Sequence, residues 1–459
     1  MATFSVAGQR VVVVGAGRSG TAAARLLASR GARVTLTDVK AQIDDAGALV
    51  AAGVELELGG HDVAMLARAD LVVLSPGVPD HQPAIAAARA RGIPVIGELE
   101  LAYRWLKGKV IAVTGTKGKS TTTTLIGRML AEEGLRVAVG GNIGLALSAQ
   151  VDSSTADTLH VVEVSSFQLE GTDTFHPWVA VLLNFSPDHL DRHASVEEYA
   201  DAKARLFANQ TEHDWAVINA DDPYVLAMAR RGRARQLLFG GASLPEGIAL
   251  TESAVVRRGP TGEETLVPLS SVRLIGRHLL ADVAAAAAAA SVAGVAPVAM
   301  TRAVEGFSGL EHALEPVAEV RGVRFVNDSK ATNIEAARRA IESFGAGLVV
   351  ILGGKFKGGD LRQLREPLAT RATAVIAIGE ARPLVKAALE GAVAVREADT
   401  FHDAVRAAYA AAGGRGVVLL APACASFDMF RDYAERGRAF KTEVAVLKRE
   451  VEGTGTRQR

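Results

Sequence analysis

The chain has 459 residues, enough for about three domains that each bury an apolar core. Its 51 Lys and Arg residues balance 51 Asp and Glu residues, which excludes both a globally basic nucleic-acid binder and an acidic disordered chain. Cys424 is the single cysteine, which excludes a disulfide framework and a cysteine-built zinc site, so we expect a reducing, cytoplasmic location. The longest apolar stretch, at 284–290, is alanine and predicts a buried helix instead of a membrane span.

Short β-branched runs alternate with alanine-rich helical stretches along most of the sequence. This alternation predicts parallel strands joined by crossover helices, and the continuous apolar character of the runs predicts strands covered on both faces. The expected strands form three groups: 11–14, 34–37 and 71–74; 110–113, 161–164, 179–183 and 216–218; and 323–326, 348–352, 374–378 and 417–420.

These groups predict an α/β protein with three domains. Breaks near residues 97 and 309 give expected domains at 1–97, 98–309 and 310–459. Residues 240–272 are less helical and rich in turn formers, which predicts an antiparallel appendage.

Ligands of open α/β sheets bind at the carboxyl ends of the strands, so the residues after each expected strand are candidates for a site. The first group of strands is followed by a GAGRSG loop at 15–20, by Asp38 and by a Ser75-Pro76-Gly77 turn. Glycines let the backbone approach a pyrophosphate, and a helix N-terminus stabilises its charge. Taken alone, the loop indicates a dinucleotide or another nucleotide diphosphate, and its ligand stays open.

A TGTKGKST segment at 114–121 follows the next expected strand. The backbone N–H groups of such a loop cradle phosphates, Lys119 can reach a terminal phosphate, and the Ser120 hydroxyl can bind Mg²⁺. The spacing departs from the usual P-loop, because Gly115 lies three residues before Gly118 instead of five. We predict binding of ATP or a close relative.

Two strand ends beside this loop carry groups that can bind a metal. Glu163 ends one strand, where Mg²⁺ would find a carboxylate oxygen, although packing or capping would also explain it. The next strand is followed by NFSPDHLDRH at 184–193, in which His189 lies between two aspartates. This arrangement favours a metal-binding or catalytic His189 over a structural one.

The third group of strands is followed by NDSKATN at 327–333, GGKFKGG at 353–359 and PACASFD at 422–428. A helix is expected after the first of these, with Asp328 or Ser329 as a possible cap. A cap does not explain Lys330 beside a helix N-terminus, where the dipole disfavours a cation. Lys330, Lys357 and Ser426 on one face suit phosphates or a carboxylate substrate.

Together these motifs, with GNIG at 141–144 and EVSSFQLE at 163–170, resemble the Mur ligases, the ATP-dependent amide-forming enzymes of peptidoglycan assembly. The resemblance covers nearly the whole chain and implies the type of each domain: a Rossmann-like N-terminal domain for the UDP-substrate at 1–97, a central P-loop ATPase-type domain with a mostly parallel sheet at 98–309, and a C-terminal Rossmann-like α/β domain that binds the amino acid at 310–459. NDSKATN and PACASFD favour the branch of the family that adds D-glutamate to UDP-N-acetylmuramoyl-L-alanine. In this family the first glycine loop holds a UDP-sugar and not NAD.

The resemblance also implies the ligand of each site. The residues implied for the UDP-substrate are Gly17, Arg18, Ser19, Asp38, Lys40, Ser75, Gly77, Asn142 and Ser165. Those implied for ATP are Gly115, Thr116, Lys117, Gly118, Lys119, Ser120, Thr121, Asp282, Asp328 and Lys330. Those implied for D-glutamate are Thr332, Lys357, Ser426, Phe427 and Tyr433.

The resemblance further implies two Mg²⁺ ions, held by Ser120, Glu163, His189 and a carbamylated Lys203. Carbamylation turns the lysine cation into an anionic oxygen ligand; the plain alternative is a surface lysine. The implied catalytic residues are Lys119, His189 and Lys203. We expect a monomeric enzyme that binds neither nucleic acid nor membrane.

Two positions depart from the family pattern. Leu279 and Asp282 stand where asparagines are usual, and Ala313 stands where a phosphate-contacting arginine is usual. Losing a charge-assisted hydrogen bond costs about 1.5–3 kcal/mol, so we expect weaker ATP binding with intact chemistry.

Three other functions remain compatible with the sequence. One is an amide ligase of the same family with another amino acid or acceptor. The second, from another class, is an NAD-dependent dehydrogenase, suggested by the glycine loop and Asp38. The third is a nucleotide-binding protein without turnover, suggested by Asp282 and Ala313.

Overall fold

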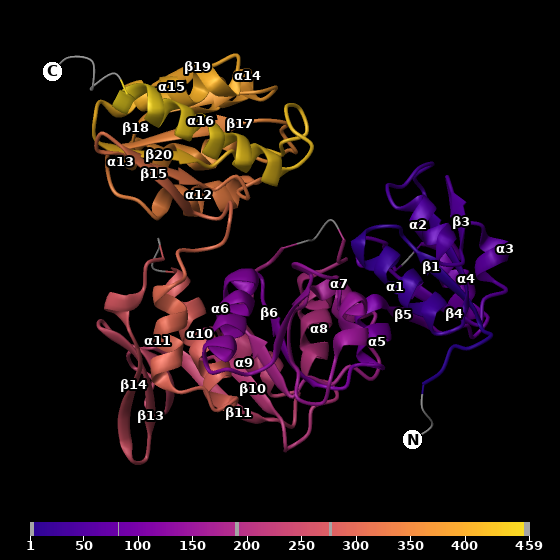
Figure 1. Ribbon diagram of the computed structural model, residues 1–459. Helices are drawn as coiled ribbons and strands as arrows, with labels where there is room; N and C mark the ends of the chain where they lie inside the picture. The colour runs from indigo at the N-terminus through magenta and orange to yellow at the C-terminus, as the bar shows by residue number, and fades with distance from the viewer. Residues whose placement is uncertain (1–3, 81, 189–191, 275–277, 454–459) are drawn as a thin grey trace. The chain divides into compact units, whose positions relative to one another are not determined.

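The computed structural model describes residues 4–80, 82–188, 192–274 and 278–453, which form three β-sheets with flanking helices (Figure 1). The chain forms two compact units, Met1–Val272 with Leu279–Gly306, and Arg273–His278 with Phe307–Arg459. The first unit holds two of the sheets and the second unit holds the third. The expected α/β class with mostly parallel sheets is confirmed. The predicted domain boundaries after residues 97 and 309 stay a prediction.

The first sheet is parallel throughout and has the order β3-β2-β1-β4-β5. Its strands are β1 (Arg10–Val14), β2 (Arg33–Asp38), β3 (Val54–Leu58), β4 (Leu71–Leu74) and β5 (Val95–Gly97). The helices are α1 (Arg18–Ser29), α2 (Ala46–Ala51), α3 (Val63–Leu66) and α4 (Pro83–Ala90). Val11 and Val13 belong to one hydrophobic core with Leu27 of α1, and Val12 and Val14 belong to another. The strand is therefore covered on both faces, as its continuous apolar sequence predicts.

The second sheet has nine strands in the order β14-β13-β12-β11-β10-β9-β6-β8-β7. They are β6 (Lys109–Thr114), β7 (Val137–Gly141), β8 (Leu159–Glu163), β9 (Val179–Leu182), β10 (Trp215–Asn219), β11 (Arg235–Gly241), β12 (Gly247–Leu250), β13 (Ala254–Gly259) and β14 (Gly262–Pro268). Because β6 lies between β8 and β9 and is parallel to both, the residues that follow these three strands meet at one edge of the sheet.

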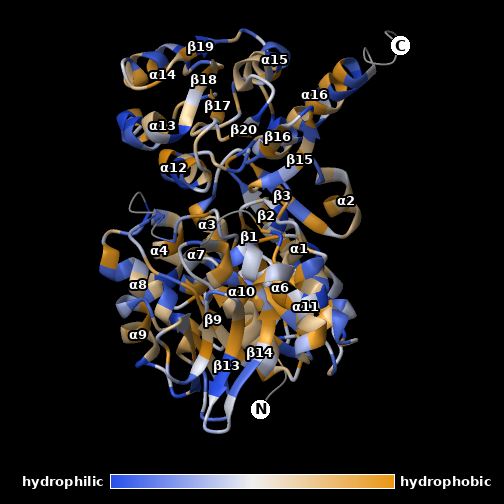
Figure 2. Cartoon of the chain, turned by 90° about the vertical axis from the view of Figure 1, so that its left-hand side faces the viewer, coloured by the Kyte–Doolittle hydropathy of each residue, from blue (hydrophilic) through white to orange (hydrophobic). Residues whose placement is uncertain are grey.

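The predicted appendage is antiparallel only in part. Strand β12 pairs parallel to β11, and β12, β13 and β14 then pair antiparallel. The segment therefore extends the second sheet. Figure 2 shows the strands of this sheet as largely hydrophobic, whereas the β13–β14 hairpin is hydrophilic towards its tip, where it carries Arg257, Arg258, Glu263 and Glu264.

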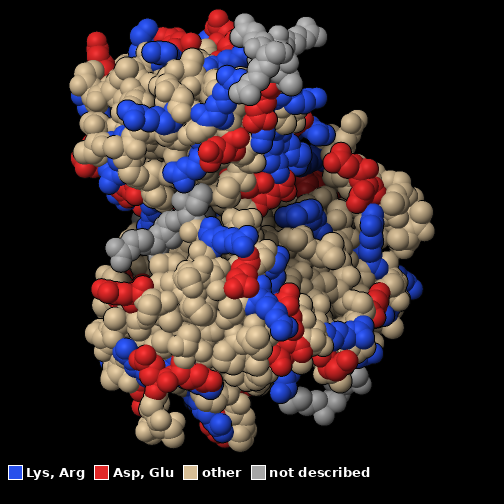
Figure 3. All heavy atoms as spheres, turned by 60° about the vertical axis from the view of Figure 1, so that its left-hand side comes forward, with Lys and Arg blue, Asp and Glu red and all other residues tan. Residues whose placement is uncertain are grey.

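The described α-helices of this part of the chain are α5 (Glu98–Tyr103), α6 (Lys119–Glu132), α7 (Ser166–Glu170), α8 (Val196–Ala204), α9 (Pro223–Ala229), α10 (His278–Val292) and α11 (Pro297–Glu305). The alanine run of α10, from Ala284 to Ala290, is fully buried, which confirms the expected core helix. Among the described residues, no helix combines the length and apolar character needed to cross a membrane. On the face drawn in Figure 3, basic side chains lie among acidic ones, in keeping with the balanced charge.

The third sheet has the order β15-β16-β20-β17-β18-β19, with only β15 antiparallel to its neighbour. Its strands are β15 (Glu315–Val320), β16 (Val323–Asn327), β17 (Leu348–Gly353), β18 (Ala372–Ile378), β19 (Val395–Glu397) and β20 (Gly416–Leu420). Its helices are α12 (Ile334–Glu342), α13 (Arg365–Arg371), α14 (Arg382–Leu389), α15 (Phe401–Ala412) and α16 (Tyr433–Gly453). Alternate residues of β17 enter two separate cores, so this sheet is also covered on both faces.

Candidate functional site

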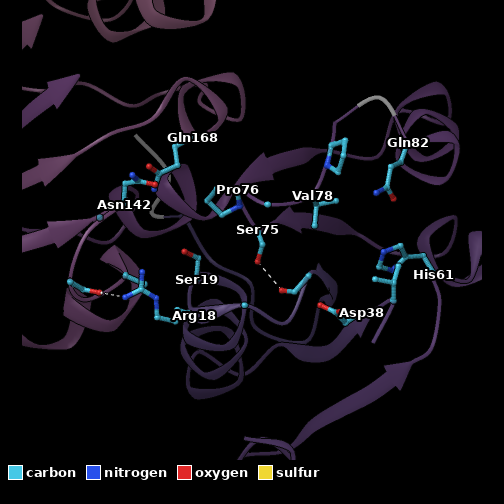
Figure 4. A pocket seen from close by; sticks show the side chains of 18 residues that line it. Arg18, Ser19, Asp38, His61, Ser75, Pro76, Val78, Gln82, Asn142 and Gln168 are labelled. Carbon is cyan, nitrogen blue, oxygen red and sulfur yellow. Dashed lines mark hydrogen bonds between the residues drawn. The ribbon is translucent and has the colours of Figure 1, made fainter. Parts of the chain in front are cut away.

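A cavity of about 480 Å³ opens at the carboxyl ends of β1, β2 and β4 and continues to the loop after β7 (Figure 4). That volume is typical of small-molecule sites. Seven of the nine residues predicted for the UDP-substrate line it: Gly17, Arg18, Ser19, Asp38, Ser75, Gly77 and Asn142. The Arg18 guanidinium donates to the Gly144 carbonyl at 3.2 Å, which links the two sheets across the cavity.

The glycine loop of this cavity is held by its neighbours. The Ala16 N–H donates to the Asp38 carboxylate at 2.6 Å, and the Ser75 hydroxyl donates to the Gly15 carbonyl at 2.8 Å. A Cβ on Gly20 would lie 1.8 Å from that carbonyl oxygen, so only glycine allows this close approach. Burial raises the pKa of Asp38, but the N–H groups of Ala16 and Lys40 more than offset it, so the net pKa is lowered.

Two residues predicted for the UDP-substrate do not line the cavity. Lys40 is exposed, and its backbone N–H donates to Asp38. Ser165 instead caps α7, in a capping box with Gln168. The cavity also contains side chains to which the sequence analysis assigned no role, among them His61, Gln82 and Gln168, which Figure 4 shows around it.

The predicted phosphate loop connects β6 to α6. Gly118 is the residue before α6 and has φ +83°, a left-handed conformation that favours glycine. The Lys119 side chain turns back over the loop, where its ammonium donates to the carbonyls of Gly115 and Thr116, both at 2.9 Å. Ser120 and Thr121 lie in the first turn of α6. The loop therefore offers backbone N–H groups, a helix N-terminus and a lysine to a phosphate.

Asn184, which follows β9, holds this loop from the adjacent strand end. Its side chain accepts from the Lys117 N–H at 2.9 Å and donates to the Lys117 carbonyl at 3.0 Å. The Thr116 N–H donates to the Asn184 carbonyl at 3.0 Å. The sequence analysis assigned no role to Asn184, because only the pairing of β9 with β6 brings it to the loop.

Lys203, in the last turn of α8, points at the same loop. Its side chain is 1% exposed, and its Nζ donates to the Gly115 carbonyl at 3.0 Å, the same oxygen that accepts from Lys119. Burial, and then the Lys119 charge, lower the pKa of Lys203 well below its ordinary value. The plain alternative of a surface lysine is therefore wrong. A lowered pKa raises the fraction of neutral amine, the form that reacts with CO₂ to give a carbamate.

Glu163 ends β8 at the same edge of the sheet. It is 2% exposed, and its Oε1 accepts from the Asn142 amide at 2.7 Å. Its Oε2 is buried and has no hydrogen-bond partner among the described residues. A buried carboxylate oxygen without a donor fits a hard cation such as Mg²⁺. His189, predicted as a metal ligand and a catalytic residue, lies outside the described residues.

Asp282, on α10, packs against the phosphate loop from another side. A Cβ placed on Gly118 would lie 2.1 Å from its Oδ1, so the carboxyl group touches the loop. Burial raises the pKa of Asp282 to about 7. Asp282 stands where the family usually has an asparagine, and a carboxyl group with a pKa near neutral pH can donate as well as accept while it is protonated.

In the second unit, three predicted loops lie side by side. β16, β20 and β17 are neighbouring parallel strands, so NDSKATN, PACASFD and GGKFKGG leave the same edge of the sheet. The backbones of Lys355 and Ala425 exchange hydrogen bonds of 2.9 and 3.0 Å between two of the loops. Lys357 is exposed, Ser426 is buried, and the Phe427 side chain is 68% exposed.

The expected cap of α12 was wrong. The helix begins at Ile334, and the Asn333 side chain caps it by accepting from the Ala336 N–H. Asp328 instead accepts from the Leu314 N–H at 3.2 Å, and burial raises the pKa of Asp328 to about 7. Lys330, exposed, and Thr332, half-buried, therefore lie in the loop between β16 and α12, separated from the first turn of the helix.

The geometry defines a class: an α/β protein with a phosphate loop, a nucleotide-sized cavity and a third sheet whose strand-end loops carry lysines. Three protein-family models match this chain. They are "Mur ligase MurD-like, N-terminal domain" at residues 9–97, "Mur ligase middle domain" at 113–290, and "Mur ligase, glutamate ligase domain" at 314–424.

Curated relatives match over nearly the whole chain. A protein of Acidobacterium capsulatum named UDP-N-acetylmuramoylalanine--D-glutamate ligase is 48% identical over 95% of each chain. A protein of the same name from Koribacter versatilis is 44% identical over 97% of this chain and 99% of its own. This protein therefore belongs to the Mur ligase family, as the sequence motifs predicted.

Solved structures agree in fold. The UDP-N-acetylmuramate-alanine ligase MurC of Thermotoga maritima has a TM-score of 0.61 at 18% identity, over 96% of this chain and all of its own. A structure of UDP-N-acetylmuramoylalanyl-D-glutamyl-2,6-diaminopimelate--D-alanyl-D-alanyl ligase from Acinetobacter baumannii has a TM-score of 0.60 at 16% identity, over 89% of this chain and 90% of its own.

Proposed function

We propose that this protein joins D-glutamate to UDP-N-acetylmuramoyl-L-alanine at the expense of ATP, as a cytoplasmic monomer in peptidoglycan precursor synthesis. The observation that carries the proposal is the similarity, at 48% and 44% identity over at least 95% of the chain, to relatives whose name states that reaction. The NAD-dependent dehydrogenase considered above finds no support in the family match.

The chemistry requires activation of a carboxylate, which is a poor acyl donor because its leaving group would be oxide. The muramoyl-L-alanine carboxylate attacks the γ-phosphorus of ATP, ADP leaves, and an acyl phosphate forms. The amine of D-glutamate then attacks the acyl carbon, and phosphate leaves from the tetrahedral intermediate. Both steps concentrate negative charge, so positioned cations supply most of the stabilisation.

Separate groups of residues bind ATP, the UDP-substrate and D-glutamate. Lys119 and the N–H groups of the phosphate loop hold the ATP phosphates, with Asp328 and Lys330 as further ATP-binding residues. The loop cavity with Arg18, Ser19 and Asn142 holds the UDP-substrate. Thr332, Lys357, Ser426, Phe427 and Tyr433 bind D-glutamate, whose carboxylates need cationic and hydroxyl partners.

Ser120, Glu163, His189 and a carbamylated Lys203 would hold up to two Mg²⁺ ions. Bound Mg²⁺ neutralises phosphate charge and polarises the acceptor oxygens. The unpartnered Glu163 oxygen and the buried Lys203 amine support this assignment. For Lys203, the neutral amine adds to CO₂ and releases a proton, which leaves an anionic carbamate.

A phosphate-release assay with an amino-acid panel tests the function. With UDP-N-acetylmuramoyl-L-alanine and ATP present, D-glutamate should be the amino acid that drives sustained phosphate release and amide formation. L-Glutamate, L-alanine and meso-diaminopimelate should leave the rate at background. Turnover with another member of the panel, and none with D-glutamate, would assign the protein to a different branch of the family.

Restoring the family's arginine at position 313 should tighten ATP binding. Ala313 is half-buried and brings no charge, so Ala313→Arg should lower the KM for ATP about tenfold, the effect of one charge-assisted hydrogen bond. Initial rates at varied ATP measure this, and Ala313→Gln, which adds length without charge, is the control. An unchanged KM in Ala313→Arg would show that this position does not meet the nucleotide.

Replacing Asp282 by asparagine should change how stability depends on pH. Because its folded pKa is raised to about 7, the folded protein binds a proton there more tightly than the unfolded chain does. Its contribution to stability is full below the unfolded pKa of about 4 and is lost as pH rises through about 7, at about 1.4 kcal/mol per pKa unit. Asp282→Asn removes this loss.

Urea unfolding at pH 5 and pH 8 measures the Asp282 effect. The variant should gain stability over the wild type at pH 8, by up to a few kcal/mol, and about a third of that at pH 5, because the loss runs between about pH 4 and pH 7. The exposed Asp44→Asn serves as the control, with the pH profile of the wild type. Identical profiles for wild type and Asp282→Asn would contradict the burial of an ionisable carboxyl group at this loop.

A further inference from the structure

Helix α16 places a charged side chain in the interior of the second unit. Arg436 is 1% exposed. Within the described residues, its side chain is one of the largest that are fully buried. Its Nε donates to the Ser329 hydroxyl at 2.9 Å, and its Nη2 donates to the Ser329 carbonyl at 3.0 Å. Nη1 and Nη2 both donate to the Cys424 carbonyl at 3.2 Å, and Nη1 also donates to the Ala425 carbonyl at 3.3 Å.

These acceptors belong to two of the loops that carry the proposed substrate-binding residues. Ser329 lies three residues before Thr332, and Cys424 and Ala425 directly precede Ser426. The third loop approaches as well, because a Cβ on Gly354 would lie 3.2 Å from Nη1 of Arg436 and 2.3 Å from the Ala425 carbonyl oxygen. The guanidinium therefore lies where the loops after β16, β20 and β17 meet.

The start of α16 closes the same network. The Ser329 hydroxyl accepts from Arg436 and donates to the Tyr433 carbonyl at 2.7 Å. The loop that carries Lys330 is thus attached twice to α16, through one serine. Tyr433 is itself a proposed D-glutamate residue.

Burying a guanidinium between loops costs free energy, because the charge loses its contact with water. Its hydrogen bonds go to a hydroxyl and to backbone carbonyls, which are all neutral, and in the described part of the chain no carboxylate forms an ion pair with it. Burial lowers the pKa of Arg436 to about 10. A buried charge is tolerated only when hydrogen bonds satisfy it, and arginine offers five N–H donors in a rigid planar fork. Lysine has three donors on a point charge and cannot match the same acceptors.

We propose that Arg436 is a positioning residue for the amino-acid substrate, because its guanidinium sets the loops around Ser329 and Cys424–Ala425 in the arrangement that presents Thr332 and Ser426. The inference rests on the proposed function for the identity of that substrate. Arg436 is buried behind the loops and does not touch the substrate itself. Its loss changes where the binding groups lie, and not their chemical nature.

Arg436→Ala and Arg436→Lys, in the full-length protein, test this against Arg449→Ala, an exposed arginine of the same helix. In Arg436→Ala the KM for D-glutamate should rise about tenfold or more, the effect of lost hydrogen bonds to a charged group. The KM for UDP-N-acetylmuramoyl-L-alanine should stay at the wild-type value, because its proposed cavity is built by the first unit. Arg436→Lys should be intermediate, and Arg449→Ala should match the wild type.

Guanidinium rescue separates positioning from a general loss of structure. Guanidinium chloride, at concentrations well below denaturing ones, should lower the KM for D-glutamate in Arg436→Ala and leave it unchanged in Arg449→Ala. Unchanged KM values in Arg436→Ala, or equal rises for both substrates without rescue, would overturn the inference.

Hydrogen exchange gives a readout that does not depend on the reaction. The N–H groups of Ala331, Ala423 and Lys355 donate to carbonyls within and between the three loops. They should lose protection in Arg436→Ala, while the strands of the same sheet keep theirs, and guanidinium should restore it. Unaltered protection, or protection lost throughout the unit, would refute the positioning role. A wild type without D-glutamate-dependent turnover would instead refute the proposed function, and the exchange result would still decide the role of Arg436.

Discussion

Replacing Lys119 by alanine should lower kcat by about a thousandfold while the protein still binds UDP-N-acetylmuramoyl-L-alanine, because the cation at the phosphate loop is lost and the substrate cavity is not touched. The Lys119 ammonium lies 2.9 Å from the carbonyl oxygens of Gly115 and Thr116, over the loop that would hold the phosphates. The residues that line the cavity come from other loops. Phosphate release measures kcat, and calorimetric titration measures the binding of the UDP-substrate.

A matched control for this variant is Lys107→Ala, which removes an exposed lysine just before β6 and should keep full turnover. Wild-type turnover in Lys119→Ala would contradict the assignment of the phosphate loop. Loss of the UDP-substrate together with turnover would contradict the separation of the two sites.

Lys203→Ala should be inactive, and added short carboxylates such as formate or acetate should partly restore its activity. The reason is that the proposed role of Lys203 is performed by a carbamate, an anionic oxygen ligand that a small carboxylate in the vacated space can replace. The side chain is buried and ends 3.0 Å from the Gly115 carbonyl oxygen, so its removal leaves space beside the phosphate loop. Initial rates with increasing formate measure the rescue.

Lys119→Ala is the control for this rescue, because a cation cannot be replaced by a carboxylate and its activity should stay low at every formate concentration. Full activity in Lys203→Ala would show that the carbamate assignment is wrong. Equal rescue of both variants would show that formate acts elsewhere.

The strands and the loops that follow them could be predicted because both depend on local sequence. β1, β6 and β17 contain continuous apolar runs, and the loops that carry the candidate site residues come immediately afterwards. Neighbouring parallel strands then bring those ends together, as at β9, β6 and β8. The glycine loop and Asp38, which line the cavity, were predicted in this way, whereas the resemblance to the Mur ligases implied Arg18 and Ser19.

Other residues of the sites depend on contacts that the sequence does not display. Asn184 acquires its role from the pairing of β9 with β6, and Gln168 reaches the cavity from α7. The raised pKa of Asp282 follows from burial against Gly118, which lies 164 positions earlier in the chain. From the sequence alone, Arg436 is one more basic residue of a surface helix. The structure shows that α16 directs its side chain inward, where it donates to Ser329 and Cys424 in the strand-end loops.

The cap of α12 shows the limit of local rules. Asp328 and Ser329 are good capping residues by type, but Asp328 accepts from Leu314 and Ser329 bonds to α16. Tertiary contacts use both side chains, and the helix begins five residues after Ser329, with Asn333 as its cap.

The most direct test follows an oxygen atom. UDP-N-acetylmuramoyl-L-alanine labelled with ¹⁸O in its carboxylate is incubated with the protein, ATP and D-glutamate, and the released phosphate is analysed by mass spectrometry. If the carboxylate attacks ATP and D-glutamate then displaces phosphate, the phosphate carries an ¹⁸O atom from the substrate. Phosphate released without label, in step with amide formation, would contradict the acyl-phosphate route on which the roles of Lys119 and Lys203 depend.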